Sequence, residues 1–136
     1  MLTKQDVLDS VDWDSVLAAP RYAGGHEEVM RTMFGDKAKV IGEWIENDYQ
    51  GDEAFAYEFS DGTIAIITDS FGSCSGCDSW EDATDKEARN LVQELAINAR
   101  LFPSRDEARK FCESGTEAAE QYTMRAAKNL VEFLSA

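Results

Sequence analysis

The residues best suited to chemistry lie in one short segment, residues 71–80, with the sequence Phe-Gly-Ser-Cys-Ser-Gly-Cys-Asp-Ser-Trp. It places a C-x-x-C motif, Cys74 and Cys77, among glycines and serines and between two aromatic residues. Small residues let the backbone turn tightly and leave its N–H groups accessible, which is typical of a tight connecting loop and also of a binding loop. The candidate binding residues are Gly72, Ser73, Cys74, Ser75, Gly76, Cys77, Asp78, Trp80, Glu81 and Asp82.

A zinc site is one interpretation of this loop. The two thiolates of a C-x-x-C are half of a structural zinc site, which normally has four ligands. The other soft ligands in the chain are Cys112 and His26, and with Cys74 and Cys77 they would make a Cys₃His set. Nothing in the spacing brings these residues together. Cys112, beside Phe111, also fits a small core residue. Zinc is therefore a candidate cofactor, and a purely structural loop stays an alternative.

Thiol chemistry is a second interpretation. A C-x-x-C at a helix N-terminus has a lowered thiol pKa, which suits a redox site or a nucleophile. Here the next helix is expected to begin near Thr84, and the nearby acidic residues would raise a thiol pKa. The same acidic residues disfavour a backbone nest for an anion. His26 is the single histidine available as a base and is distant in sequence, so no catalytic residue is assigned and an enzyme is the less favoured class.

The loop also carries a resemblance. Tyr49-Gln50-Gly51, then Asp61-Gly62, then Gly72 to Asp78 with Trp80, resemble an uncharacterised family of small bacterial and phage proteins. Those proteins share an aromatic-Gln-Gly, a hairpin and a G-S-C-S-G-C-D motif, and the resemblance covers residues 47–82. It implies a phage or prophage origin and a shared loop, and it assigns no activity.

The overall charge excludes several partners. The 136 residues include 27 acidic and 13 basic ones, for a net charge of −14. Binding through nucleic-acid phosphates or to an anionic membrane needs a basic surface, so neither is expected. The sequence begins without a signal-like segment and has no apolar run long enough to span a bilayer. Three cysteines are too few for a disulfide framework, and a cytoplasmic location is therefore expected.

The acidic residues are concentrated in the middle of the chain. No lysine or arginine lies between Lys39 and Lys86, and residues 52–85 carry nine acidic residues. Such a segment is either a solvated face or a surface that attracts cations or a basic protein. We therefore predict a small interaction protein that binds a basic protein surface through residues 40–85 and the 72–80 loop, with nucleic-acid mimicry as a sharper version. A zinc-binding module and a thiol-based enzyme are the alternatives, and the sequence does not set the oligomeric state.

The first half of the chain predicts short helices and then strands. Thr3 and Asp6 begin a helix that breaks near residues 12–14, and a second helix covers residues 26–34. Alternating apolar runs on both sides of Asp61-Gly62 predict a hairpin with a type I′ turn. Residues 38–47 fit a helix or a strand, and their Val, Ile and Trp content slightly favours a third strand.

The second half predicts helices only. Thr84 with Glu87 begins one that ends near Phe102-Pro103, and Ser104 with Glu107 begins another. A last helix after Thr116 would have as its core side Tyr122, Ala126, Leu130, Phe133 and Leu134. The prediction is one α+β domain over residues 1–136, a small antiparallel meander of two to three strands packed with N-terminal and C-terminal helices.

Overall fold

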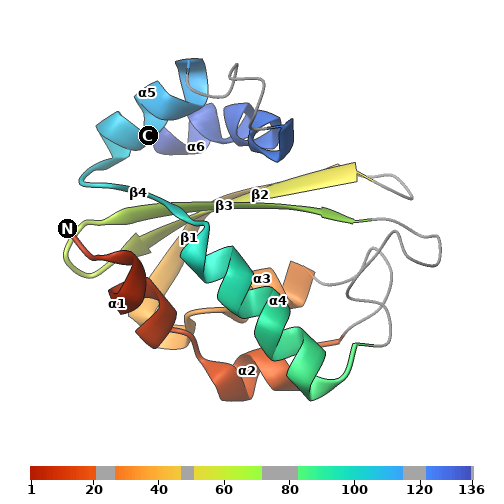
Figure 1. Ribbon diagram of the computed structural model, residues 1–136. Coiled ribbons are helices and arrows are strands. Elements are labelled where there is room, and N and C mark those ends of the chain that lie inside the picture. Colours follow the sequence, from red (N-terminus) through yellow and green to blue (C-terminus); the bar gives the residue numbers. More distant parts are fainter. Residues whose placement is uncertain (21–26, 47–50, 72–82, 115–121, 136) are drawn as a thin grey trace.

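A computed structural model describes residues 1–20, 27–46, 51–71, 83–114 and 122–135 of the chain. It has a four-stranded antiparallel sheet between two layers of helices (Figure 1). The strands are β1 (Ala38–Ile45), β2 (Gly51–Phe59), β3 (Ile64–Phe71) and β4 (Arg100–Phe102), in the spatial order β1-β2-β3-β4. The predicted α+β class is confirmed, and residues 38–45 form the strand that the composition slightly favoured. The sheet has four strands, rather than the two to three predicted.

Helices cover both faces of the sheet (Figure 1). On one face lie α1 (Lys4–Asp9), α2 (Trp13–Ala18), α3 (Glu27–Thr32) and α4 (Asp85–Ile97). On the other lie α5 (Arg105–Ser114), the 3₁₀ helix η3 (Tyr122–Leu130) and α6 (Val131–Leu134), while a short 3₁₀ turn, η1 (Gly35–Lys37), precedes β1. The capping boxes predicted at Thr3 and Thr84 are both present. Within the described residues, no helix has the length and apolar character needed to cross a bilayer.

The alternation along β2 and β3 divides the core in two. Phe55, Tyr57 and Phe59 face the N-terminal helices and α4, together with Ala65 and Ile67 of β3. The alternate residues of the same strands face the C-terminal helices, and they are Ala54, Ala56, Ile64 and Ile66. Because a strand points successive side chains to opposite faces, both runs are buried once helices cover both sides. The sheet is thus the shared centre of two apolar clusters.

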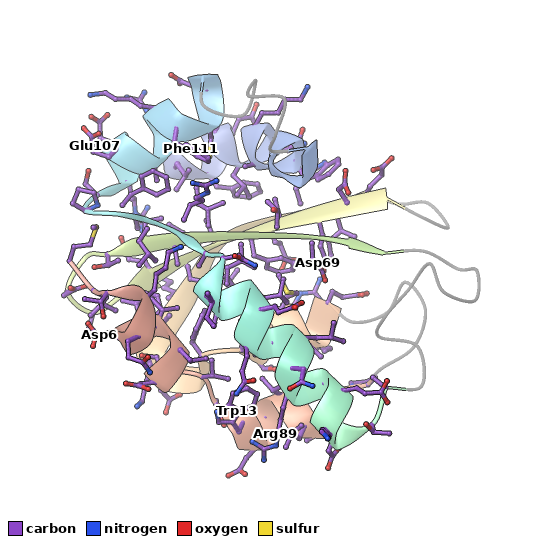
Figure 2. All side chains as sticks on the ribbon, viewed as in Figure 1. Asp6, Trp13, Asp69, Arg89, Glu107 and Phe111 are labelled. Carbon is purple, nitrogen blue, oxygen red and sulfur yellow. The ribbon has the colours of Figure 1, made fainter. Side chains whose placement is uncertain are left out.

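A cation–π contact joins two helices of the N-terminal side. The Arg89 guanidinium carbon of α4 lies 5.1 Å from the centre of the Trp13 ring of α2 (Figure 2). Such contacts contribute modestly when exposed, because water competes for the cation. Trp13 is therefore part of the packing between α2 and α4.

The hairpin between β2 and β3 is where it was predicted, but its turn differs. Phe59 N–H donates to the Thr63 carbonyl at 2.9 Å, and Gly62 N–H donates to the Phe59 carbonyl at 2.9 Å. This pattern closes a three-residue loop, Ser60 to Gly62, whereas a type I′ turn has two residues. Gly62 has a φ of +92°, the conformation that a G1 bulge requires of its glycine.

Two predictions in the second half are wrong. The helix that begins after Thr84 ends at Ile97, and Arg100–Phe102 form β4, which pairs with Ile64–Ile66 of β3. A strand of only three residues is too short to show the alternation of apolar and polar residues that identifies a strand in a sequence. Phe133 was placed on the core side and is 43% exposed, although Ala126, Leu130 and Leu134 are buried as predicted.

Gly42 brings α6 against β1. The pairing register shifts between Val40 and Gly42, so Ile41 is an extra residue and β1 contains a bulge. Gly42 is buried, and a Cβ built on it would lie 2.7 Å from the Cβ of Phe133 and 2.9 Å from its Cγ. A side chain at this position would therefore push α6 away from the sheet.

We expect Gly42→Val to lower the free energy of unfolding by about 1–3 kcal/mol, the usual cost of forcing extra atoms into a packed contact. Urea unfolding followed by circular dichroism measures the change. Gly62→Ala is the comparison, because nothing lies within 4 Å of its built Cβ and only its positive φ opposes a side chain. A Gly42→Val protein as stable as the unmodified one would contradict the packing described for α6.

Candidate functional site

The acidic segment of the sequence is partly neutralised by bases from outside it. Arg31 of α3 donates to both carboxylate oxygens of Glu43 of β1, at 2.9 and 3.1 Å. Arg105 of α5 binds Glu58 of β2 in the same bidentate way, at 2.9 and 3.0 Å, and so lowers the pKa of Glu58. The N-terminal ammonium lies 3.8 Å from Asp61. These three acids are therefore compensated in the folded protein.

Apart from Asp85 at the start of α4, the other acidic residues in the described part of residues 40–85 gather at one end of the sheet. We call Glu46, Asp52, Glu53 and Asp69 the acidic end. Glu53 of β2 is directly opposite Asp69 of β3. Glu46 N–H donates to the Asp52 carbonyl at 3.0 Å, and Asp52 N–H donates to Glu46 Oε2 at 3.1 Å. Figure 2 shows Asp69 close to the end of β3, on the side of the sheet that faces α3 and α4.

Glu53 is the residue of this end that sequence reasoning missed. Its side chain is 1% exposed and lies on the same face as Phe55 and Tyr57. The Tyr57 hydroxyl donates to the Met30 carbonyl at 2.7 Å, and burial, followed by the charges of Glu53 and Glu43, raises its pKa well above 10. Period-two counting from Phe55 would have placed Glu53 inward. The acidic end therefore includes a residue that is buried in the core as well as partly exposed carboxylates.

Asp52 shows that the acidic end carries an electrostatic cost. Burial raises its pKa above the ordinary 3.8, and the charges of Glu46 and Asp69 raise it further. A raised pKa means that the folded protein holds this proton more tightly than the unfolded chain, so the ionised carboxylate destabilises the fold at neutral pH. A bound cation or basic side chain would relieve this cost.

Asp52→Asn is accordingly expected to raise the free energy of unfolding at neutral pH. The gain should vanish below pH 3.8, where Asp52 is protonated in both the folded and unfolded states. Urea unfolding at a series of pH values measures it. Asp9→Asn, on an exposed part of α1, makes the same change in net charge, and an equal effect from both variants would rule out a local cause.

The residues of the predicted loop lie outside the described part of the chain. These are residues 72–82, with Cys74 and Cys77, and His26 lies outside it as well. The described strand before the loop ends at Phe71, whose backbone pairs with Gly51 next to the Asp52–Ser70 pair. The predicted loop therefore follows directly on the acidic end in the chain, and its role stays a prediction.

Cys112 is the one predicted metal ligand that the structure describes. It is fully buried in the cluster between the sheet and the C-terminal helices, with Ala108 and Ile66. Burial raises the pKa of its thiol to about 12, which disfavours the thiolate that binds zinc. Among the residues that are described, no group of three or more His, Cys, Asp and Glu side chains is placed to hold a metal ion. The full Cys₃His set is untested.

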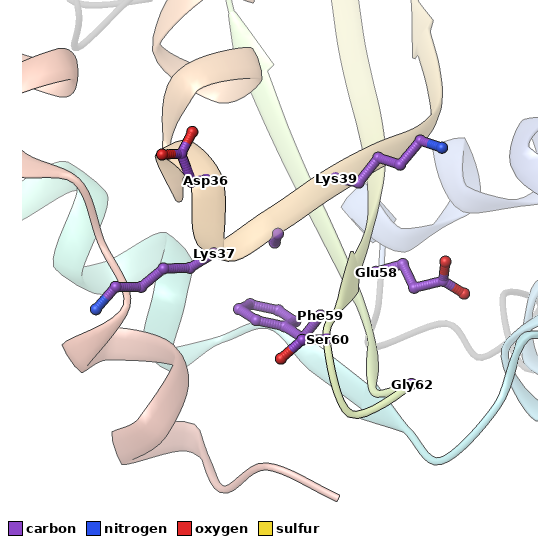
Figure 3. A pocket seen from close by; sticks show the side chains of 8 residues that line it. Asp36, Lys37, Lys39, Glu58, Phe59, Ser60 and Gly62 are labelled. Carbon is purple, nitrogen blue, oxygen red and sulfur yellow. The ribbon is translucent and has the colours of Figure 1, made fainter.

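An open cleft lies at the opposite end of the sheet. It has a volume of about 490 Å³ and is lined mainly by the start of β1 and the end of β2, with Lys37, Lys39 and Glu58 (Figure 3). Its aromatic residue, Phe59, is 4% exposed and belongs to the core. The cleft carries charges of both signs, and its Glu58 is already paired with Arg105, so the acidic end is the better candidate site.

Comparisons with protein-family models, with curated proteins and with solved structures gave no significant match. The chain is thus characterised here by its α+β fold, with helices on both faces of the sheet, and by the acidic end of that sheet.

Proposed function

We propose that this is a small acidic binding protein that engages a basic protein surface through the acidic end of its sheet and the 72–80 loop. The observation that carries the proposal is the selective neutralisation of the acidic segment. Glu43, Glu58 and Asp61 have bases beside them. Glu46 and Asp52 have no ion pair with a base within the described residues, and Asp52 is ionised at a cost.

An acidic surface that includes Glu46 and Asp52 favours a basic partner for physical reasons. Its field attracts positive charge and speeds encounter, and contact with lysine or arginine lowers the repulsion among the carboxylates. A net charge of −14 adds a long-range attraction toward any basic protein. In a sharper form of the proposal, the carboxylates occupy phosphate positions on a nucleic-acid-binding protein. We place the protein in the cytoplasm, and the resemblance of its loop supports a phage or prophage origin.

Affinity capture from the host of origin tests this function. The expected result is a discrete captured protein with a basic surface that is released by salt. Elemental analysis of the same sample examines the zinc alternative, in which Cys74 and Cys77 are ligands. About one equivalent of zinc per chain, with unfolding on chelation and no basic partner, would overturn the proposal in favour of a metal-stabilised module.

A further inference from the structure

β1 is an edge strand with partly exposed apolar side chains on it and beside it. It is eight residues long, and within the described ranges no strand pairs with its outer side. Val40, Ile41 and Ile45 are only partly buried, and Phe133 beside the strand is 43% exposed. A shallow groove of about 490 Å³ follows this edge between Lys39 and Phe133. Unpaired backbone groups beside apolar side chains are a template for another strand.

Because of the bulge, the order in which the side chains of β1 face the two layers of helices is symmetric about the middle of the strand. Ala38, Val40 and Ile45 face the N-terminal helices, and Glu43 does so through Arg31. Ile41 and Trp44 face the C-terminal helices, as does Gly42 beneath Phe133. Lys39 points to that side as well (Figure 3). Read from either end, the order of faces is the same about a centre between Ile41 and Gly42.

The backbone of β1 has the same symmetry. Glu46 N–H donates to the Asp52 carbonyl, and in an antiparallel ladder every second residue bonds to the neighbouring strand. The backbone groups of Trp44 therefore point toward β2, and those of Glu43 and Ile45 point outward. Before the bulge, Lys39 is opposite Glu58. Glu58 is six residues from Asp52 along β2, so its backbone N–H and C=O groups also point toward β1 and bond to Lys39. Ala38 and Val40 therefore turn outward. The outward N–H and C=O groups are thus placed symmetrically about the same centre.

We propose that β1 binds a second copy of this chain in antiparallel register, with Ala38 opposite Ile45 and Val40 opposite Glu43. Every pair then joins residues on the same face of the sheet, and the outward backbone groups of both copies meet. Shifting the register by one residue would put opposite faces together. The two sheets become one continuous sheet across a two-fold axis, an isologous interface.

The charges on β1 complement each other in this register. Lys39 of one copy lies opposite Trp44 of the other and diagonal to its Glu46, which continues the strand on the same face. Diagonal neighbours in a sheet are within reach of long side chains. The two-fold axis makes this contact twice. The dimer contact shares Glu46 with the acidic end, whereas Asp52 and Asp69 lie on β2 and β3. Asp52→Asn/Asp69→Asn therefore tests partner binding without altering the dimer contact, and Lys39→Glu tests the dimer without altering the acidic end.

Sedimentation equilibrium at rising protein concentration tests the dimer. At about 0.15 M salt, repulsion between the two acidic chains is screened beyond about 8 Å. The unmodified protein should approach twice its mass of 15.1 kDa. Lys39→Glu should weaken the dimer about tenfold, because it places like charges together twice. The double variant Lys39→Glu/Glu46→Lys should restore it, since the opposite charges are exchanged.

Lys37→Glu is the matched control. It makes the same change in net charge, but Lys37 points toward the N-terminal helices, away from Lys39 (Figure 3). Circular dichroism confirms that each variant is folded, and the restored double variant excludes a trivial loss of structure. A monomeric mass at every concentration would overturn the proposal. So would a dimer that Lys39→Glu leaves unchanged, or a double variant as weak as Lys39→Glu alone.

Discussion

Replacement of Phe55 by alanine is expected to lower the free energy of unfolding by about 3–5 kcal/mol. Phe55 is fully buried at the centre of β2, between Glu43 of β1 and Ile67 of β3. Its ring stacks on Tyr57, with centroids 6.2 Å apart. Truncation to alanine removes the apolar transfer energy and leaves a cavity that the sheet cannot close, because neighbouring strands hold the backbone in place.

Urea unfolding followed by both tryptophan fluorescence and far-ultraviolet circular dichroism measures this loss. Ile97→Ala is the control, since Ile97 is 48% exposed and its truncation should change the stability by less than about 0.5 kcal/mol. The two probes should report one coincident transition, because both helical layers pack on the same sheet. A Phe55→Ala protein as stable as Ile97→Ala would contradict the assignment of the core.

Neutralising the acidic end is expected to weaken partner binding about tenfold. In the double variant Asp52→Asn/Asp69→Asn, two carboxylates become amides of the same shape, and two charge contacts of somewhat under 1 kcal/mol each would be lost. The measurement is the dissociation constant for the captured basic partner. Asp52→Asn alone should already weaken binding while it stabilises the free protein, which a purely structural role for Asp52 would not produce.

Asp9→Asn/Glu94→Gln is the matched control for this prediction. Both residues are exposed acids on helices, α1 and α4, and the control changes the net charge by the same amount as the acidic-end variant. If the attraction came only from total charge, the two double variants would bind equally weakly. An equal loss in both would therefore place the binding surface elsewhere than at the acidic end.

Local signals explain the parts of the fold that the sequence predicts well. The boxes at Thr3 and Thr84 and the glycine at position 62 act over a few residues, and all are found in the structure. β4 was missed because a strand of three residues owes its existence to pairing with β3, which is distant in sequence. Phe133 was misplaced because helical spacing alone does not show that it packs over Gly42 of the edge strand β1, where its side chain is 43% exposed.

The candidate site was predicted as a whole segment and is narrower in the fold. A linear charge map cannot show that Arg105 reaches Glu58 across 47 positions, or that Arg31 reaches Glu43. These ion pairs remove part of the predicted acidic field and leave the acidic end. The Cys74 and Cys77 loop lies outside the described residues, so its predicted role depends on the experiments above.

The salt dependence of binding to the captured partner tests the central proposal most directly. Binding carried by the acidic end should weaken steeply between low and physiological ionic strength, because exposed charges are screened beyond about 8 Å at 0.15 M salt. The slope should be shallower for Asp52→Asn/Asp69→Asn than for the Asp9→Asn/Glu94→Gln control. An affinity that stays constant as salt is added would contradict an acidic surface that binds a basic protein.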